Sequence, residues 1–242
     1  TMVRRWFIAN HGLTFHAYTR LRRLGMALRQ IQHGEPVSRA VVASGFDSES
    51  GFRDAFAQVF GNPPSAVDRE SSIWVNRVAT PLGSMILGVH DDGLCLLEFA
   101  ERRMLDTQLG RLSRHMGRVF LPGEHPLMEQ TKQELDAYFA GTLRHFDIPV
   151  QTPGTAFQEA VWHALREIPY GETRSYAEIA AATGRADAVR AVGRANGDNR
   201  IAIVIPCHRV VGSDGELVGY GGGLWRKEYL LAMEQAQAFH LT

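Results

Sequence analysis

The sequence has few cysteines and no excess of charge of either sign. Cys95 and Cys207 are its two cysteines among 242 residues, and they form no Cys-x-x-Cys pair. Two cysteines in unlike surroundings exclude a disulfide framework and a four-cysteine metal site, so we expect a reducing, cytoplasmic location and no metal. Lys plus Arg number 26 and Asp plus Glu number 26, which excludes a net electrostatic attraction of the whole chain to nucleic acid. DNA binding would have to depend on local patches.

Long apolar segments are also lacking. No uninterrupted apolar run reaches the ~18 residues that a membrane-spanning helix requires, and the start shows no signal-peptide pattern. We therefore expect a chain that is neither inserted into a membrane nor secreted. Its 242 residues exceed the usual single-domain range of about 100–200 residues, so more than one domain is expected.

The first seventy residues have helical periodicity and a modest positive charge. Nine Arg and six acidic residues occur there, and apolar residues recur at spacings of three and four at Leu21, Leu24, Leu28 and Ile31. A compact two-helix pattern follows. Pro36 opens a short helix, Gly45 breaks it, and Ser48 can cap a second helix that carries Phe52 and Phe56. This spacing is typical of a helix-turn-helix and equally of a helical hairpin with no role in DNA binding.

The segment SRAVVASGFDSESGFRDAFAQVFGNPPS, from Ser38 to Ser65, resembles the second helix-turn-helix of AraC-type regulators. The preceding RRWFIANHGLTFHAYTRLRRLGMAL resembles the end of the first helix-turn-helix and the linker helix of that family, without its opening helix. The resemblance implies a partial AraC-type module over residues 1–69. It also implies contacts of Ser48 and Arg53 with DNA, and promoter DNA and the transcription machinery as partners.

After a polar join at residues 66–73, the pattern changes from helical spacing to alternation. Turn residues at 81–83 and 91–93 separate three segments, which predicts an antiparallel sheet with the strands Ile73–Ala79, Ser84–Val89 and Leu94–Phe99. Two helices, Glu101–His115 and Pro126–Ala140, and a short strand at Phe146–Val150 are expected to complete a domain over residues 74–150. Cys95 would be a small buried side chain of the third strand, without chemistry.

From residue 151 onward, the pattern predicts a helical domain that extends to residue 242. Thr155 to Gln158 and Ser175 to Glu178 both fit the capping box that starts a helix. After the second box, a turn at Gly184 leads to a helix of mostly small residues that Asp187 can cap and that extends through Asn196. This is a second helix-turn-helix pattern. A helix of small residues can approach another surface closely, with Arg190 or Arg194 extending furthest from it.

The strongest chemical signal follows that helix. The apolar run Ile201–Ile205 suits a buried strand, and Pro206 ends it directly before Cys207 and His208. A thiol beside a proton acceptor is a candidate nucleophile, because the thiolate is the reactive species. The residues alone leave alternatives open, since Cys207 could be a buried side chain with no chemical function. A cysteine protease would need a third group, and a metal site would need further ligands that this segment does not supply.

The block Pro206-Cys-His-Arg-Val210 resembles the active site of methylated-DNA–protein-cysteine methyltransferases. The likeness extends from Gly171 to Gln235 and, more loosely, from about residue 74. It implies an Ada-type enzyme that needs no cofactor and acts once. A methyl or alkyl group moves irreversibly from O6-alkylguanine, or from O4-alkylthymine, in double-stranded DNA to Cys207, and a stable thioether remains.

The same resemblance assigns roles to further residues. It implies that His208 activates Cys207 through a water molecule, that Glu234 orients His208, and that Asn199 braces the site. It implies base flipping, because the alkyl carbon of a stacked base cannot be reached inside the duplex. Two residues of the second helix-turn-helix would serve that step, since Tyr176 helps to rotate the nucleotide and Arg190 fills the vacated place.

The pocket for the flipped base is expected near the segment Val218-Gly-Tyr-Gly-Gly-Gly223, where glycine allows the backbone to approach a flat base. The substrate-binding residues implied there are Val210, Tyr220 and Gly221, and Gly221 stands where relatives often carry Ser. Arg194 would join Arg190 in contacting DNA.

These expectations combine into a multidomain α+β protein. A helical helix-turn-helix module precedes a small antiparallel sheet with helices, and a winged-helix-like alkyltransferase domain follows. Two other functional classes stay open, namely a transcription regulator with a vestigial transferase domain and a non-catalytic recogniser of damaged bases. The presence of Cys207 argues against the recogniser, because relatives of that kind lack the acceptor cysteine.

Overall fold

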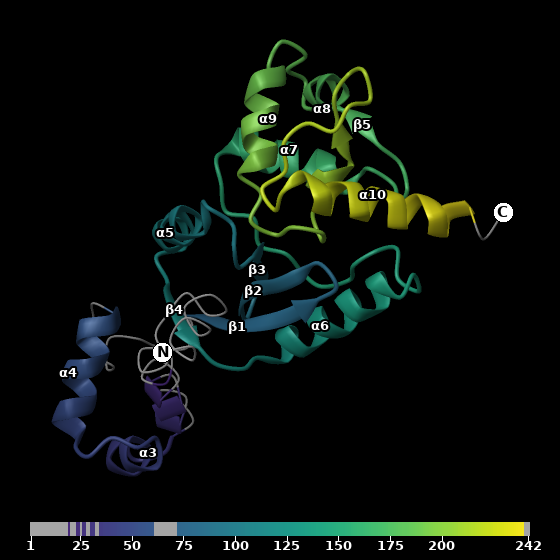
Figure 1. Cartoon of the computed structure of the whole chain (residues 1–242). Helices are drawn as coiled ribbons and strands as arrows, with labels where there is room; N and C mark the ends of the chain where they lie inside the picture. The colour runs from purple at the N-terminus through teal and green to yellow at the C-terminus, as the bar shows by residue number, and fades with distance from the viewer. Residues whose placement is uncertain are drawn as a thin grey trace, which may run out of the picture.

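The computed structural model describes residues 34–60 and 72–239 and, before them, residues 19, 23, 24, 26, 27, 30 and 31. The helical pattern expected at Leu21 and Leu28 and most of the polar join lie outside the described residues. Figure 1 shows a small helical part at low residue numbers, a sheet with two flanking helices, and a helical part at the C-terminal end. No helix in these described ranges is both long and apolar enough to cross a membrane.

The N-terminal helix pair forms as predicted. Helix α3 (Val37–Ala43) and helix α4 (Glu49–Phe60) are separated by a turn at Gly45. The Ser48 hydroxyl accepts a hydrogen bond from the Gly51 backbone N–H at 3.1 Å, so it satisfies a free donor at the start of α4. Phe46 of the turn packs edge to face against Phe52 of α4 at 5.4 Å, and this contact holds the turn against α4.

The three predicted strands are present as an antiparallel meander of β1 (Ser72–Thr80), β2 (Gly83–His90) and β3 (Gly93–Phe99). The sheet is mixed rather than purely antiparallel, because β4 (Val119–Pro122) adds to β1 in parallel, in the order β3-β2-β1-β4. The four residues of β4 are too short to show a periodic pattern. The prediction of a strand at Phe146–Val150 is wrong, because that segment forms only a single bridge, between Val150 and Leu94.

Two helices accompany the sheet. Helix α6 (Pro126–Phe139) agrees with its prediction, and the ring of His125 caps it by accepting from the Leu127 N–H at 3.2 Å. Helix α5 (Leu105–Met116) begins four residues later than predicted. The residues before it turn instead, and the Arg102 guanidinium donates to the Asn199 carbonyl of the C-terminal domain at 3.1 Å. This tertiary contact overrides the helical pattern.

The C-terminal domain contains the predicted helices and a short two-stranded sheet, so the fold as a whole is α+β. Its elements are α7 (Ala156–Arg166), β5 (Arg174–Ser175), α8 (Tyr176–Ala182), α9 (Val189–Gly197), β6 (Val210–Val211) and α10 (Leu224–Phe239). The capping boxes at Thr155 and Ser175 are both complete. Asp187 is not the cap of α9, because Ala188 occupies that position without a side-chain hydrogen bond.

The apolar run Ile201–Ile205 is buried, but it is not the extended strand that we expected. Ile201 bridges to Leu97 of β3, and the chain then folds back on itself, with Ile203 at the left-handed φ of 74°. The Ile205 N–H donates to the Ile201 carbonyl at 2.9 Å, which closes the turn. The run therefore rests on the edge of the sheet and delivers the residues after Pro206 into the interior.

Gly93 allows a test of the close packing between the start of β3 and the backbone at Pro149. Gly93 has φ 146°, and a Cβ there would lie 2.5 Å from the Pro149 carbonyl oxygen, which is backbone and cannot move away. We expect Gly93→Ala to lower the free energy of unfolding by more than about 1 kcal/mol. Gly110→Ala is the matched control, because nothing lies within 4 Å of its Cβ position and the residue is inside α5. It should leave stability unchanged or raise it by up to about 1 kcal/mol. Denaturant titration measures both, and equal effects would contradict the packing described.

Candidate active site

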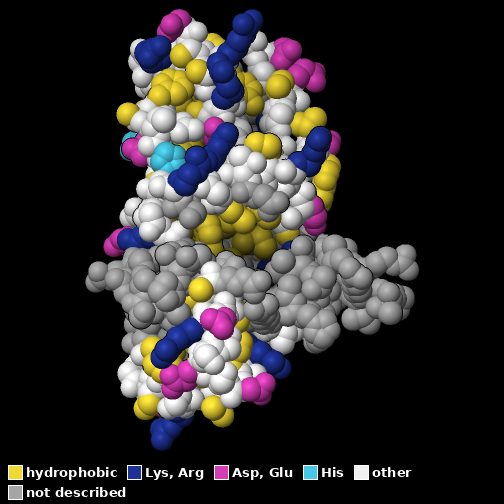
Figure 2. Space-filling view, turned by 90° about the vertical axis from the view of Figure 1, so that its left-hand side faces the viewer, with side chains coloured by type: hydrophobic (Ala, Val, Ile, Leu, Met, Phe, Trp, Pro, Cys, Tyr) yellow, Lys and Arg dark blue, Asp and Glu magenta, His cyan; other side chains and the backbone are white. Residues whose placement is uncertain are grey.

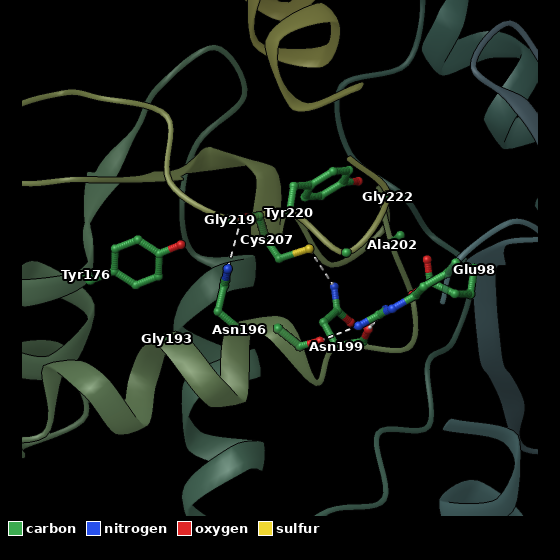
Figure 3. A pocket seen from close by; sticks show the side chains of 13 residues that line it. Glu98, Tyr176, Gly193, Asn196, Asn199, Ala202, Cys207, Gly219, Tyr220 and Gly222 are labelled. Atoms are coloured by element: carbon green, nitrogen blue, oxygen red, sulfur yellow. Dashed lines mark hydrogen bonds and ion pairs between the residues drawn. The ribbon is translucent and has the colours of Figure 1, made fainter. Parts of the chain in front are cut away.

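Cys207 lies at the wall of a cavity of about 150 Å³ between the sheet edge and the C-terminal domain. Figure 3 shows the labelled residues that surround it, which come from the end of β3, from α8 and α9, from the segment Asn199–Cys207, and from the loop at Gly219–Gly222. The cavity is lined by polar groups and by small residues, among them Tyr176, Asn196, Asn199, Tyr220 and Gly221. It can admit a small planar group next to the sulfur.

The Cys207 thiol is buried and neutral at rest. The residue is only 6% exposed, and burial raises the pKa of its thiol to about 11, although the Asn199 hydrogen bond opposes that rise. A thiol with such a pKa is almost entirely protonated at neutral pH. Nucleophilic attack therefore requires a group that accepts the thiol proton during the reaction.

Asn199 holds both the sulfur and the loop that carries it. Its Nδ2 donates to Sγ of Cys207 at 3.1 Å and to the Ile205 carbonyl at 2.9 Å, while its Oδ1 accepts from the Ile201 N–H at 3.0 Å. The amide thus fixes the fold-back of residues 201–205 from inside. Figure 3 shows its contact with the Cys207 sulfur. A donor aimed at sulfur also favours the thiolate over the thiol.

His208 is the nearest proton acceptor in the sequence, and its environment keeps it neutral. Its Nε2 lies 2.9 Å from Oε1 of Glu234, and both side chains are fully buried. Burial lowers the pKa of His208, against the raising effect of Glu234. Because Glu234 can only accept, Nε2 carries the proton and Nδ1 has the free lone pair. That Nδ1 is buried and has no hydrogen-bond partner among the described residues.

Glu234 is a fully buried carboxylate that is held by several donors. Burial opposes its ionisation, but the hydrogen bonds from His208 and Arg209 outweigh this and hold its pKa well below the usual range. Arg209 donates through Nε to Oε2 and through Nη2 to Oε1, each at 2.9 Å. The Tyr138 hydroxyl donates to Oε1 at 2.6 Å, and the Gly171 N–H donates to Oε2 at 3.2 Å. The ion pair with Arg209 keeps the carboxylate charged while His208 stays neutral.

A buried lysine supports the opposite side of the site. Nζ of Lys227 donates to the carbonyls of Val210 at 2.5 Å and Val218 at 2.8 Å, and burial lowers its pKa to about 8. Val210 was predicted to bind substrate. It lies buried on β6, and its carbonyl is engaged by Lys227.

The other predicted pocket residues lie around the cavity. Tyr176 begins α8, and its hydroxyl donates to the Val218 carbonyl at 3.1 Å. The Tyr220 hydroxyl is buried and has no partner within the described ranges. A Cβ at Gly221 would lie 2.7 Å from Cζ of Arg102, so a serine at this position would require the arginine to move.

The predicted DNA-binding residues are exposed and do not join the cavity. Arg190 and Arg194 both lie on α9, at the edge of the C-terminal domain in Figure 1. Ser48 and Arg53 belong to the separate N-terminal helix pair, where Arg53 forms an ion pair with Glu49 at 3.1 Å. The structure therefore brings together Cys207, His208, Glu234 and Asn199, and leaves the arginines on the surface.

Several residues of the site were not identified from the sequence. Arg209 follows the Cys-His pair directly, so the block itself carried the signal for it. Tyr138, Lys227 and Arg102 are distant in sequence and become neighbours only through packing. Asn196 was read only as the end of a helix. No group of three or more His, Cys, Asp or Glu side chains in the described part of the chain could hold a metal ion.

Family models match three consecutive stretches of the chain. Residues 1–70 match a helix-turn-helix domain, and residues 76–152 match the ribonuclease-like domain of 6-O-methylguanine DNA methyltransferase. Residues 156–236 match the DNA-binding domain of the same enzyme. The last two matches together cover most of the sheet, the residues that line the cavity, and Cys207.

Curated relatives and solved structures agree with these matches. A methylated-DNA–protein-cysteine methyltransferase of Mycobacterium leprae is 46% identical over 158 residues, which are 65% of this chain and 90% of that protein. The constitutive enzyme of that name from Bacillus subtilis is 42% identical, over 64% of this chain and 92% of its own. A Mycobacterium tuberculosis structure described as OGT in complex with DNA is 41% identical, with a TM-score of 0.59, over 69% of this chain and 94% of its own. This chain therefore belongs to the methylated-DNA–protein-cysteine methyltransferase family.

Proposed function

We propose that this chain repairs DNA by moving a methyl or larger alkyl group from O6-alkylguanine irreversibly to Sγ of Cys207. The observation that carries the proposal is the buried thiol at the cavity wall, followed directly by a neutral histidine held by Glu234. In the reaction, the bond between the alkyl carbon and the guanine oxygen breaks and a carbon–sulfur bond forms. The thiol proton leaves the sulfur, and the released guanine takes up one proton. No group is oxidised or reduced, and the thioether ends the protein's activity.

The proton path follows from the tautomer of His208. Its Nδ1 has the free lone pair, because Nε2 is committed to Glu234. We infer that Nδ1 takes the Cys207 proton through a bridging water molecule, as the family resemblance implies. The developing imidazolium then gains the field of the Glu234 carboxylate, and the developing thiolate gains the Asn199 donor at 3.1 Å.

Double-stranded DNA is the proposed partner, supported by the relative solved in complex with DNA. On the face shown in Figure 2, Lys and Arg side chains are spread over the upper and lower parts and are mixed with Asp and Glu. The described residues on this face therefore form no broad basic surface that could hold the duplex. The exposed α9, with its small residues, suits close approach to DNA, with Arg190 entering the base stack and Tyr176 turning the nucleotide toward the cavity.

A second role belongs to the N-terminal helices. We propose that residues 1–69 are part of an AraC-type regulator that reads promoter DNA of the alkylation response. The match of residues 1–70 to a helix-turn-helix domain supports this proposal. In this proposal α4 enters the major groove, Ser48 and Arg53 lie toward the DNA, and the transcription machinery is a further partner. Repair would be carried by the residues from about 74 onward.

The identity of the acceptor is tested with duplex DNA that carries a labelled methyl group on the guanine oxygen. Cys207→Ala should abolish transfer completely, because no other thiol lines the cavity within the described residues. Cys95→Ala is the control, since Cys95 is buried in β3 and should not be needed. The label should appear once per protein molecule, on the peptide that contains Cys207. Transfer in Cys207→Ala, or many turnovers by the unaltered protein, would contradict the mechanism.

The role of His208 predicts a pH dependence. His208 must be neutral to accept a proton, and burial lowers its pKa, so the rate of transfer should fall only as the pH drops below the ordinary histidine value of 6.5. His208→Asn should lower the rate at neutral pH by about 100-fold or more. In that variant the rate should instead rise with pH toward the thiol pKa of about 11. Single-turnover rates across pH measure this, and an unchanged acid limb in His208→Asn would exclude His208 as the acceptor.

Arg190 is expected to matter only when the base is stacked. Arg190→Ala should slow transfer from duplex DNA by at least about tenfold, because extrusion of a nucleotide costs a few kcal/mol. Transfer from the free modified base should stay the same. Arg185→Ala is the matched control, as it removes an equal charge from an exposed arginine that pairs with Asp187 at 3.7 Å. Equal slowing on both substrates would show that Arg190 has another task.

A further inference from the structure

Residues of β3 and α5 hold the short turn that joins α9 to the active site. This turn comprises residues 197–200, between the end of α9 and the buried fold-back. The Leu97 N–H of β3 donates to the Arg200 carbonyl at 2.8 Å. Arg111 of α5 forms an ion pair with Asp198 at 2.7 Å. The turn that follows the small-residue helix is therefore fixed from the sheet side and not by its own domain alone.

Arg102 bonds the backbone of this turn at two points. Its guanidinium donates to the Asn199 carbonyl at 3.1 Å and to the Gly197 carbonyl. Both acceptors lie at the C-terminal end of α9, where the helix dipole also favours a positive charge. A guanidinium carries its N–H donors in a fixed planar geometry, so it can hold two carbonyls at a set spacing, which a single ammonium cannot do as well.

A buried carboxylate fixes Arg102 in turn. Oε2 of Glu98 on β3 accepts from Nη1 of Arg102, and Oε1 accepts from the Phe99 N–H at 2.9 Å. The two charged side chains are only 1% and 7% exposed, respectively. A buried ion pair is weak evidence for added stability, because the loss of hydration offsets the attraction of the charges. What the pair supplies is a defined position of the guanidinium.

Asn199 connects this ion pair to the nucleophile. Its backbone carbonyl is held by Arg102, and its side-chain Nδ2 donates to Sγ of Cys207 at 3.1 Å. The residue is only 2% exposed, and the same side-chain amide bonds the Ile201 N–H and the Ile205 carbonyl. The side chain therefore has no room to adjust by itself. A shift of the turn would change the hydrogen bond to the sulfur.

We propose that Arg102, anchored by Glu98, is a positioning residue that holds the Asn199 amide against Sγ of Cys207. The proposal rests on the function proposed above and deepens it, because it gives the edge of the β1–β4 sheet a part in activating the thiol. Arg102 acts through Asn199 in this scheme. Loss of the Arg102 contact should therefore have no further effect once the Asn199 amide has been removed.

The test measures single-turnover transfer from the free O6-methylguanine base, so that DNA binding does not enter. Glu98→Gln combined with Arg102→Met removes both buried charges and leaves neither unpaired. This pair variant should slow transfer by about tenfold or more. Adding Asn199→Ala to it should give the rate of Asn199→Ala alone, because changes that act through one interaction are not additive. Arg114→Ala is the control, since it removes an exposed arginine of α5 and should keep the rate.

Hydrogen exchange gives a second readout that does not depend on the reaction. In ¹⁵N-labelled protein without DNA, the Nδ2 protons of Asn199 should exchange faster in the pair variant than in the unaltered chain. The Trp162 indole N–H, which donates to the Ala195 carbonyl at 2.8 Å, should stay protected and serves as the internal reference. Equal acceleration at both groups would show a general loosening of the domain and would overturn the proposal.

Arg102→Lys is a second variant in case the pair variant does not fold. Lysine keeps a positive charge beside Glu98 but cannot hold both carbonyls, so it should slow transfer less, and that effect should also vanish with Asn199→Ala. Slowing that adds to the effect of Asn199→Ala would overturn the proposal, as would an unchanged rate in the pair variant. If the unaltered chain transfers no methyl group from base or duplex, the proposed function fails, and the exchange of the Asn199 protons still decides whether Arg102 holds the amide.

Discussion

The burial of the Glu234 carboxylate is the constraint on which the rest of the site depends. A fully buried charge is tolerated only when it is paired and hydrogen-bonded, and here the donors come from three separate segments. Tyr138 lies on α6, Gly171 follows α7, and His208 and Arg209 belong to the 3-10 turn that begins at Cys207. Removing one of these donors would leave charge uncompensated. The position of the thiol is therefore coupled to the packing of α10 against the rest of the C-terminal domain.

The pKa shifts of Cys207 and His208 are opposite in direction, as the proposed mechanism requires of a nucleophile that is used once. Burial raises the pKa of Cys207 and lowers that of His208, so both groups are neutral before substrate arrives. In the proposed mechanism, moving the proton from Cys207 to His208 creates a thiolate and an imidazolium. This step becomes favourable only when substrate is bound, because the leaving oxygen of the substrate then takes up part of the negative charge. Glu234 and Arg209 already neutralise each other, and they hold the imidazole in one tautomer. We propose that this neutral state protects the thiol from indiscriminate alkylation before DNA binds.

The sequence predicted the features that depend on neighbouring residues. The two capping boxes, the hairpin at Asp91 and Asp92 and the Cys207-His208 pair all follow from local pattern. The fold-back at Ile201–Ile205 was missed, because its cause is the Asn199 amide and the edge of β3 rather than its own apolar composition. Asn196 and Lys227 were missed for the same reason, since their significance comes from which backbone carbonyls they meet in the folded chain. The roles of the predicted site residues in the reaction stay predictions.

The central claim is that Cys207 is a neutral thiol at rest and depends on His208 for activation. An NMR pH titration of the Cys95→Ala protein with ¹³C-labelled cysteine reports the ionisation of Cys207 alone. The account predicts a thiol signal throughout the neutral range, with ionisation only as the pH approaches about 11. A thiolate signal at neutral pH would contradict it, because the nucleophile would then be formed before any proton acceptor was needed.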